Sequence, residues 1–223
     1  MLGLIALGKG SRPDFDDAMR SLLPKVRYSI VGALDSLDES VIASLAEGGD
    51  YLLRVPAYGS SWEIPRDRLL PYVRAADSAL RQQGAAVTLL MCAGDFPFLS
   101  VGGILLYPGR IMPSLLKAFF PWERSGHIGI ILPNETQMRF AAAHWERWGL
   151  RVTVDWASPS AVGAVGEAVR RLSPHVDAIV LDCMGFGLRH EQEAGGETDK
   201  PVFSSLRGAL CIAGSFVSGK NER

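Results

Sequence analysis

The sequence predicts an α/β protein of two pseudo-symmetric lobes, each a parallel sheet flanked by helices, with an active-site cleft between the lobes. Short apolar runs alternate with longer amphipathic segments, as in parallel α/β folds. The apolar runs are continuous, which is typical of strands buried on both faces. The pattern then restarts after a looser stretch rich in Gly and Pro over residues 95–109. The 223 residues, 48% of them hydrophobic, are enough for such a core.

The first half of the chain accounts for one lobe. We expect strands over residues 2–8, 28–34 and 85–92. We expect helices over residues 14–24, 37–48 and 66–84, with Gly84 as a helix C-cap. Between the last two helices, residues 51–65 are typical of a short extended pair or hairpin.

The second half repeats the alternation. We expect strands over residues 126–133, 151–157, 176–183 and 201–205. We expect helices over residues 110–120, 134–149, 158–173 and 206–217, with caps at Asn134 and at Ser158, where Pro159 occupies the first turn. Lobe 1 is therefore predicted to comprise residues 1–100 plus a C-terminal helix over 206–220, and lobe 2 residues 101–205.

Composition and charge exclude several classes of function. The net charge of −1 gives no electrostatic reason to expect nucleic acid or an anionic membrane as a partner, and no apolar run is long enough to span a bilayer. The first fifteen residues lack the basic region and cleavage site of a signal peptide. Three cysteines without a C-x-x-C pair are no disulfide framework, so we expect a cytoplasmic protein. No metal motif, dinucleotide fingerprint or P-loop is present, so we expect no metal and no cofactor.

Four residues mark the carboxyl ends of predicted strands. They are Gly8, Cys92, Pro133 and Cys183. Ligands of open parallel sheets bind beyond these ends. If the lobes face each other, we expect the four positions to line one shared cleft.

Two of these positions are cysteines, and each is predicted to lie between a strand and a helix N-terminus. The unpaired N–H groups and the dipole of a helix favour the thiolate there. Two thiols on opposite walls of a cleft suit general acid–base catalysis, in which one removes a proton and the other returns one. Cys92 and Cys183 are therefore the candidate catalytic pair, although buried cysteine is also a common core residue. Cys211 lies in an apolar helical run and is interpreted as core.

Residues around the two thiols and in the loop after the first strand are candidates for substrate binding. The Arg12 fork suits a carboxylate, the backbone amides after each cysteine suit an oxyanion, and a histidine near a thiol raises its thiolate fraction. Asp95 is expected in the first turn of a helix, either assisting proton transfer or capping that helix. The full set is Ser11, Arg12, Ala93, Gly94, Asp95, Met184, Gly185, Arg189 and His190. Asp182 should point away from Cys183 and is interpreted as structural.

The segments "LGKGSRPDF", "VGALDSLDE", "LLMCAGDFP", "GRIMPSLL" and "VLDCMGFGLRHE" together resemble the AroM family. That family is similar to the aspartate/glutamate racemase superfamily, which also includes hydantoin racemases, maleate cis–trans isomerases and arylmalonate decarboxylases. The resemblance implies a fold of two pseudo-symmetric α/β lobes with the active site between them.

The superfamily's racemases carry one catalytic cysteine per lobe, and Cys92 and Cys183 match these positions. The presence of both argues against the one-cysteine pattern of the decarboxylases. The amino-acid racemases follow the first cysteine with Asn-Thr and the second with Thr, side chains that hold the substrate carboxylate. Here Ala93-Gly94 and Met184-Gly185 stand instead.

The leading hypothesis is a cofactor-independent racemase, epimerase or isomerase that acts on a small carboxylate or cyclic amide. A cis–trans isomerase with one covalent cysteine is the first alternative. A small-molecule binding or regulatory protein without catalysis is the second. The superfamily resemblance implies a homodimer or a higher homo-oligomer.

Overall fold

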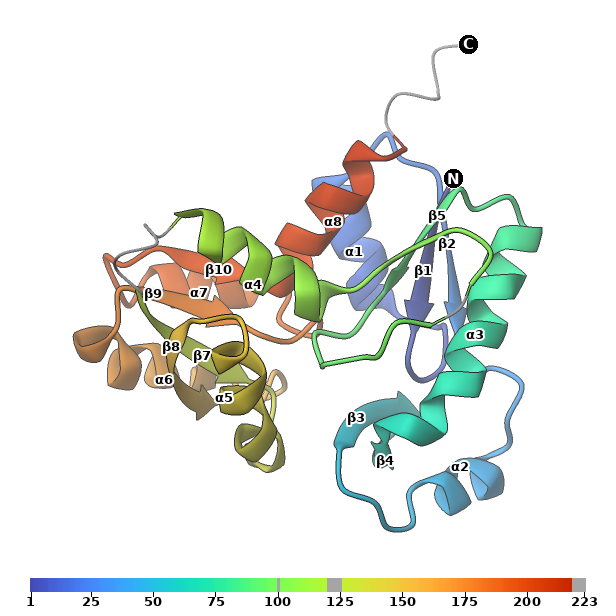
Figure 1. Ribbon diagram of the computed structural model, residues 1–223, viewed down its shortest axis with the longest axis horizontal. Coiled ribbons are helices and arrows are strands. Elements are labelled where there is room, and N and C mark those ends of the chain that lie inside the picture. The colour runs from blue at the N-terminus through green and yellow to red at the C-terminus, as the bar shows by residue number, and fades with distance from the viewer. Residues whose placement is uncertain (100, 120–125, 218–223) are drawn as a thin grey trace. The chain divides into compact units, whose positions relative to one another are not determined.

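The computed structural model describes residues 1–99, 101–119 and 126–217. The chain divides into two compact units (Figure 1). Unit 1 comprises residues 1–108 together with residues from 209 onward, and unit 2 comprises residues 109–208. Position 100, and the ends of the helices predicted over 110–120 and 206–220, lie outside the described residues.

The core of unit 1 is a four-stranded parallel sheet in the order β2-β1-β5-β6. Its strands are β1 (Leu2–Ala6), β2 (Tyr28–Gly32), β5 (Val87–Leu90) and β6 (Ile104–Leu106). Every residue of β1 and β5 is buried, as their continuous apolar runs predict.

Unit 2 contains a second four-stranded parallel sheet in the order β8-β7-β9-β10. Its strands are β7 (His127–Leu132), β8 (Arg151–Trp156), β9 (Ala178–Leu181) and β10 (Val202–Ser204). When the four strands of each sheet are numbered in chain order, both sheets have the same spatial order, 2-1-3-4. The predicted fold class, parallel sheets flanked by helices in two similar halves, is confirmed.

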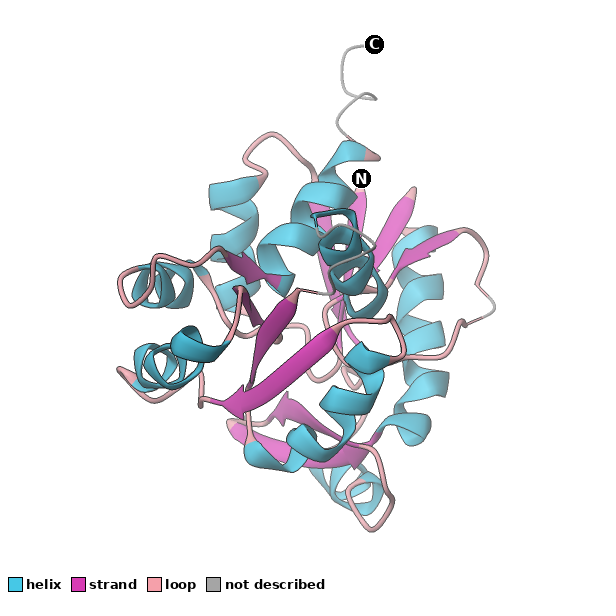
Figure 2. Cartoon of the chain, turned by 60° about the vertical axis from the view of Figure 1, so that its left-hand side comes forward, coloured by secondary structure: helices cyan, strands magenta, loops and turns pink. Residues whose placement is uncertain are grey.

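Helices cover the sheets (Figure 2). The α-helices are α1 (Pro13–Leu22), α2 (Glu39–Leu45), α3 (Arg66–Gln82), α4 (Pro108–Phe119), α5 (Met138–Glu146), α6 (Ala164–Leu172), α7 (Leu188–Gly195) and α8 (Ser205–Ser215), with short 3-10 helices η1 (Glu135–Gln137) and η2 (Ser173–His175). Alternate residues of β9 enter different cores: Ile179 and Leu181 pack with residues of α6, while Ala178 and Val180 pack with residues of α4 and α5. This strand is thus buried on both faces.

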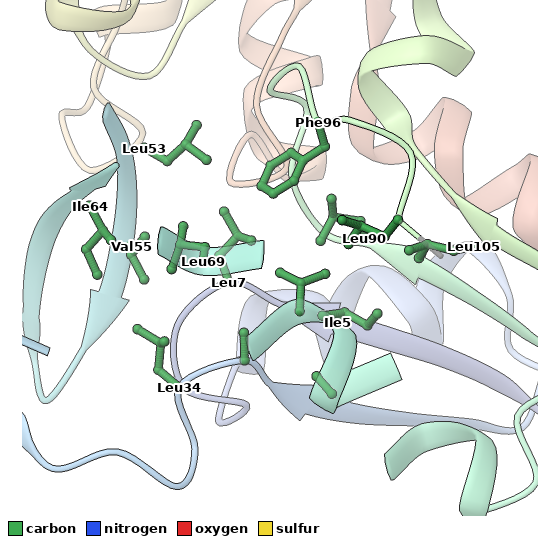
Figure 3. Packing of buried hydrophobic residues seen from close by; sticks show 14 of the residues in the cluster. Ile5, Leu7, Leu34, Leu53, Val55, Ile64, Leu69, Leu90, Phe96 and Leu105 are labelled. Carbon is green, nitrogen blue, oxygen red and sulfur yellow. The ribbon is translucent and has the colours of Figure 1, made fainter. Parts of the chain in front are cut away.

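A hairpin inserted between α2 and α3 forms the predicted extended pair. Strands β3 (Leu52–Ala57) and β4 (Ser60–Pro65) are antiparallel and are joined by Tyr58 and Gly59 at positive φ, the conformation of a two-residue primed turn. Leu53 and Val55 of the hairpin join the same hydrophobic cluster as Phe96 from the loop after β5 (Figure 3). The hairpin therefore packs beside the carboxyl end of the first sheet.

Two predicted helix ends are confirmed. Gly84 has φ of 90° and donates its N–H to the Arg81 carbonyl, while Ala85 donates to Leu80, which is a Schellman C-terminus. The Asn134 side chain accepts the N–H of Gln137 at 3.1 Å and caps η1, directly before α5.

Two predictions about local structure are wrong. The helix predicted from Ser158 begins at Ala164, because Gly163 has φ of 80° and the preceding residues form a turn. The stretch predicted as loose contains a strand, β6, at the sheet edge. Arg81 and Thr88 both donate to the Ile104 carbonyl, so contacts distant in sequence stabilise this strand.

Candidate active site

Cys92 follows β5 and Cys183 follows β9, which are the third strands of their sheets in chain order. Each of these strands pairs with the first strand of its sheet, β5 with β1 and β9 with β7. The N–H of Met91 donates to the Ile5 carbonyl at 2.9 Å, and the N–H of Asp182 donates to the Ile131 carbonyl at 2.8 Å. Both cysteines are therefore the first residues past the last interstrand bond. This is the switch point at which open parallel sheets bind ligands.

The residues after the two cysteines form the same turn. The Gly94 N–H points at Cys92 Sγ with a nitrogen–sulfur distance of 3.3 Å, and Gly185 N–H points at Cys183 Sγ at the same distance. Both cysteines and both glycines are half-buried. A backbone N–H donated to sulfur stabilises the thiolate relative to the thiol.

Neither turn continues directly into a helix, so the expectation of a helix N-terminus behind each thiol is wrong for Cys92. Residues 91–99 form a loop, and Asp95 lies in this loop and not in a helical turn. The α7 helix begins five residues after Cys183, at Leu188. At each sulfur, a backbone N–H of the turn supplies positive partial charge in place of the predicted helix dipole.

A glycine lies beside each sulfur, and the two glycines differ in their surroundings. A Cβ placed on Gly94 would lie 3.0 Å from Leu53 Cδ2, a tight contact, as well as 3.4 Å from Cys92 Sγ and 3.7 Å from the Tyr51 hydroxyl oxygen. A Cβ placed on Gly185 would lie 3.5 Å from Cys183 Sγ and 3.9 Å from the Pro159 ring. The side chains of the intervening residues, Ala93 and Met184, are buried.

A tyrosine and an arginine beside the Cys92 turn were missed by the sequence reasoning. The Tyr51 hydroxyl oxygen accepts the Asp95 N–H at 3.1 Å, and Arg66 donates to the Asp95 carbonyl at 2.8 Å. The Arg66 guanidinium also lies 4.9 Å from the centre of the Tyr51 ring. The two residues flank the hairpin. No local sequence signal indicates that this hairpin lies beside the Cys92 turn.

The loop after β1 is fixed by Asp35. Its carboxylate accepts the N–H groups of Gly10 at 2.8 Å and Gly32 at 2.7 Å. Arg12, predicted to bind substrate, makes two hydrogen bonds to Asp14 and stacks over a phenyl ring. Ser11, between these anchored residues, is exposed.

Arg189 and His190 meet at one carbonyl group. Arg189 donates to the Pro159 oxygen at 2.7 Å, and the Nε2 atom of His190 lies 3.0 Å from the same oxygen. His190 is buried, and its Nδ1 has no hydrogen-bond partner among the described residues. Both residues therefore hold the loop after β8, whose Pro159 lies beside the Cys183 turn.

Asp182 is buried and points away from the turn, as strand alternation predicts. Its two oxygens accept from Trp145 Nε1 at 3.0 Å and from the Ser205 hydroxyl at 2.9 Å. Burial raises the pKa of the Asp182 carboxyl above its ordinary value, because desolvation of the charge outweighs these two hydrogen bonds and the attraction of His144.

Asp182→Asn is expected to become more stable relative to the wild type as pH rises from acid to neutral. A carboxyl with a raised pKa in the folded state stabilises the fold most when protonated and loses that contribution as pH rises through its pKa. Asparagine avoids this loss, since its oxygen can accept from Trp145 and its amide can donate to the Ser205 oxygen. Urea unfolding of both proteins at several pH values measures the difference, and a difference that does not change with pH contradicts the prediction.

Comparison with known proteins places this geometry in context. The family model described as AroM protein matches residues 2–210. A mutant of arylmalonate decarboxylase in its sulfate-associated form is similar in structure, with a TM-score of 0.64 and 18% identity over 100% of this chain and 94% of that one. No curated protein matches the sequence at a significant level.

Two racemases of known structure are also similar. Allantoin racemase from Klebsiella pneumoniae has a TM-score of 0.61 and 14% identity, over 97% of this chain and 87% of that one. The Picrophilus torridus aspartate racemase has a TM-score of 0.58 and 13% identity, over 96% and 94% of the two chains. At these identities the likeness is one of fold.

In residues 1–99, 101–119 and 126–217, no three His, Cys, Asp or Glu side chains gather in a way that could hold a metal ion. Over the same part of the chain, every helix is too short or too polar to cross a membrane.

Proposed function

The chain belongs to the AroM protein family, and from this premise we propose that it is a cofactor-independent racemase, epimerase or isomerase acting on a small carboxylate or cyclic amide. In this proposal Cys92 and Cys183 are the acid/base pair. The fold shared with aspartate and allantoin racemases supports the reaction class.

One observation carries the proposal: the two cysteines have the same backbone environment in two sheets of the same topology. Each follows the third strand, and each sulfur faces the N–H of the second residue after it at 3.3 Å. A cysteine that only fills a core needs no such donor. Two equally prepared thiols suit a reaction that uses one as a base and the other as an acid.

The chemistry needs only protons. One thiolate removes the proton from the carbon next to a carbonyl or carboxylate, and the electron pair passes into that group as an enolate. The other thiol donates its proton to the opposite face of the same carbon. The first cysteine then holds a thiol and the second a thiolate, so the next turnover can run in the reverse sense.

The test is exchange of the substrate proton in deuterated water. Aspartate, glutamate, allantoin and substituted hydantoins would each be incubated with the protein, and deuterium at the reacting carbon measured by mass spectrometry and optical rotation. We expect racemisation with incorporation of one deuterium in at least one of these substrates.

The two alternatives give different results in the same assay. A cis–trans isomerase with a covalent step would leave an adduct on a single thiol, visible in the intact mass. A binding protein would show ligand-dependent thermal stabilisation with no deuterium incorporated. Either result would contradict the two-thiol proposal.

A further inference from the structure

The outer strand of the second sheet leaves part of its main chain unpaired. β8 lies at the edge of this sheet beside β7 (Figure 1), and no strand of the described residues pairs with its other side. The residues of β8, RVTVDW, are all exposed or half-buried. An open strand edge is a template for pairing with another chain. We propose that β8 pairs antiparallel with β8 of a second copy of this chain, about a two-fold axis at Thr153, and so forms a homodimer.

The hydrogen bonds to β7 determine which main-chain groups of β8 face the open edge. The Ala157 N–H donates to the Leu132 carbonyl at 2.9 Å. Bonds of a parallel ladder recur at every second residue, so the odd-numbered residues of β8 direct their N–H and C=O groups toward β7. The even-numbered residues, Val152, Val154 and Trp156, therefore direct theirs outward.

Val152 and Val154 supply the groups for pairing. The outward N–H of Trp156 is already bonded to Asp155 Oδ1 at 2.8 Å, whereas the outward groups of the two valines have no partner among the described residues. With the axis at Thr153, Val152 lies opposite Val154 of the second copy. In an antiparallel pair, two residues placed in this way each donate to and accept from the other. The free groups of one edge thus match those of the same edge in the second copy.

The charged side chains of β8 fit the same register. Arg151 lies opposite Asp155 of the second copy, and opposite charges directly across two strands stabilise their pairing. Arg151 is exposed and makes no ion pair with any described residue. Asp155 Oδ2 accepts from Arg171 of α6 at 2.8 Å, and a carboxylate has lone pairs left for a further guanidinium. The strand is therefore complementary in charge to itself when it runs in the opposite direction.

The apolar side chains lie on the other face of β8. Val152 and Val154 pack against the cluster that contains residues of α5, and Trp156 is 40% exposed. In the proposed register, Trp156 of one copy lies diagonally across from Val152 of the other, within reach of an aromatic side chain. Pairing thus covers apolar surface that the single chain exposes.

Neighbouring registers fit less well. An axis at Val154 would place Trp156, whose N–H is already bonded, opposite Val152. An axis at Val152 would place Arg151 opposite Thr153 and leave Asp155 without an opposite charge. The axis at Thr153 satisfies both the main chain of the valines and the two charges.

The other edge strands of the two parallel sheets lack these features. β6 and β10 have three residues each. In β2, the N–H of the last residue, Gly32, is bonded to the Asp35 carboxylate at 2.7 Å, and the strand carries no charged residue. β8 is therefore the edge best suited to pair with itself. Because one strand edge buries little surface, we expect a reversible dimer whose population depends on protein concentration.

The experiment changes the residue on the two-fold axis. Thr153 is exposed and lies opposite its own copy, so Thr153→Lys and Thr153→Glu each place like charges opposite each other. Sedimentation equilibrium over a range of protein concentrations gives the dissociation constant of the dimer. We expect the wild type to dimerise and each variant alone to associate about fivefold more weakly, the upper end for a cross-strand pair. An equimolar mixture of the two variants should associate at least as tightly as the wild type, although both have lost the Thr153 bond to His127.

A second variant and a control test the main-chain part of the proposal. Val152→Pro removes an outward N–H, and proline is tolerated on the open side of an edge strand, so the variant should fold and remain monomeric. Gln192→Lys and Gln192→Glu are the matched control for added charge. Gln192 is exposed on α7, which packs beside β10 at the opposite edge of the same sheet. Each control variant, and their mixture, should have the dissociation constant of the wild type.

Four results would overturn the proposal. The first is a wild type that remains monomeric at every concentration, a measurement that needs no variant to fold. The second is a mixture of the two Thr153 variants that associates no more tightly than either alone. The third is a dimer of wild-type strength in Val152→Pro. The fourth is an assembly larger than a dimer, because the pairing uses the one open edge of β8 in each copy. Since association needs no turnover, these results are independent of the deuterium-exchange test.

Discussion

Cys92→Ser and Cys183→Ser are each expected to lower the rate of racemisation about 10³-fold, because each removes one of the two groups that transfer the proton. A serine hydroxyl is a far weaker acid than a thiol, and it is not ionised at neutral pH. The measurement is optical rotation with the substrate identified by deuterium exchange.

The two variants should also differ from each other. Each retains one thiol, so each is expected to exchange the reacting proton of one enantiomer only, without inverting it. The enantiomer that exchanges should be opposite in the two variants. Cys211→Ser is the control. The interpretation of Cys211 as a core residue is wrong, since this cysteine is exposed on α8, and its replacement should have no effect. Racemisation at the wild-type rate in either Cys92→Ser or Cys183→Ser would exclude the two-thiol mechanism.

Gly8→Ala is expected to destabilise the protein by about 3 kcal/mol, at the upper end for overpacking a buried site. A Cβ on Gly8 would lie inside the contact distance of the Pro56 carbonyl oxygen, a backbone atom of the hairpin. The neighbouring Lys9 N–H donates to this same oxygen at 3.2 Å. The hairpin must move away to admit the methyl group, and this hydrogen bond is then lost.

Chemical denaturation measures the change, and Gly195→Ala is the matched control. Gly195 lies in α7, where a Cβ would meet no atom within 4 Å. Alanine should be neutral or slightly stabilising there, because glycine is the poorer helix former. A Gly8→Ala protein as stable as this control would contradict the close approach of hairpin and loop.

The sheets and their cysteines were predictable because their signals are local. Continuous apolar runs predict β1, β5, β7 and β9 by burial on both faces. Asn134 and Gly84 predict their helix ends from the conformations that these residue types favour. Cys92 and Cys183 are at equivalent positions because each follows the third strand of its half of the chain, which the order of apolar runs predicts.

Features that depend on distant contacts were not predictable in this way. The three residues of β6 are too few for a periodic pattern, and their edge position is stabilised by Arg81 from α3. α6 begins later than predicted because Gly163 has a positive φ. The Ser158-Pro159 pair is typical of a helix start and so predicted an earlier one. Tyr51 is 41 positions before Cys92 and reaches the turn only because the hairpin folds back.

Arg189 and His190 illustrate a further limit of sequence reasoning. Their residue types predict contact with a substrate, which stays a prediction, and no sequence signal indicates the contact that both make with the Pro159 carbonyl. Residue type gives the chemistry of a side chain, whereas its partner depends on which loops the fold places around it.

The hydrogen bond from the main chain to each sulfur has a consequence for how this site can change during evolution. The donors belong to the backbone of residues 94 and 185, so they do not depend on the side chains that surround the two thiols. Side chains around the thiols can therefore be exchanged without removing the groups that prepare the thiols to react. Under the proposed two-thiol mechanism, substrate preference can therefore change while the backbone donors to both sulfurs are kept.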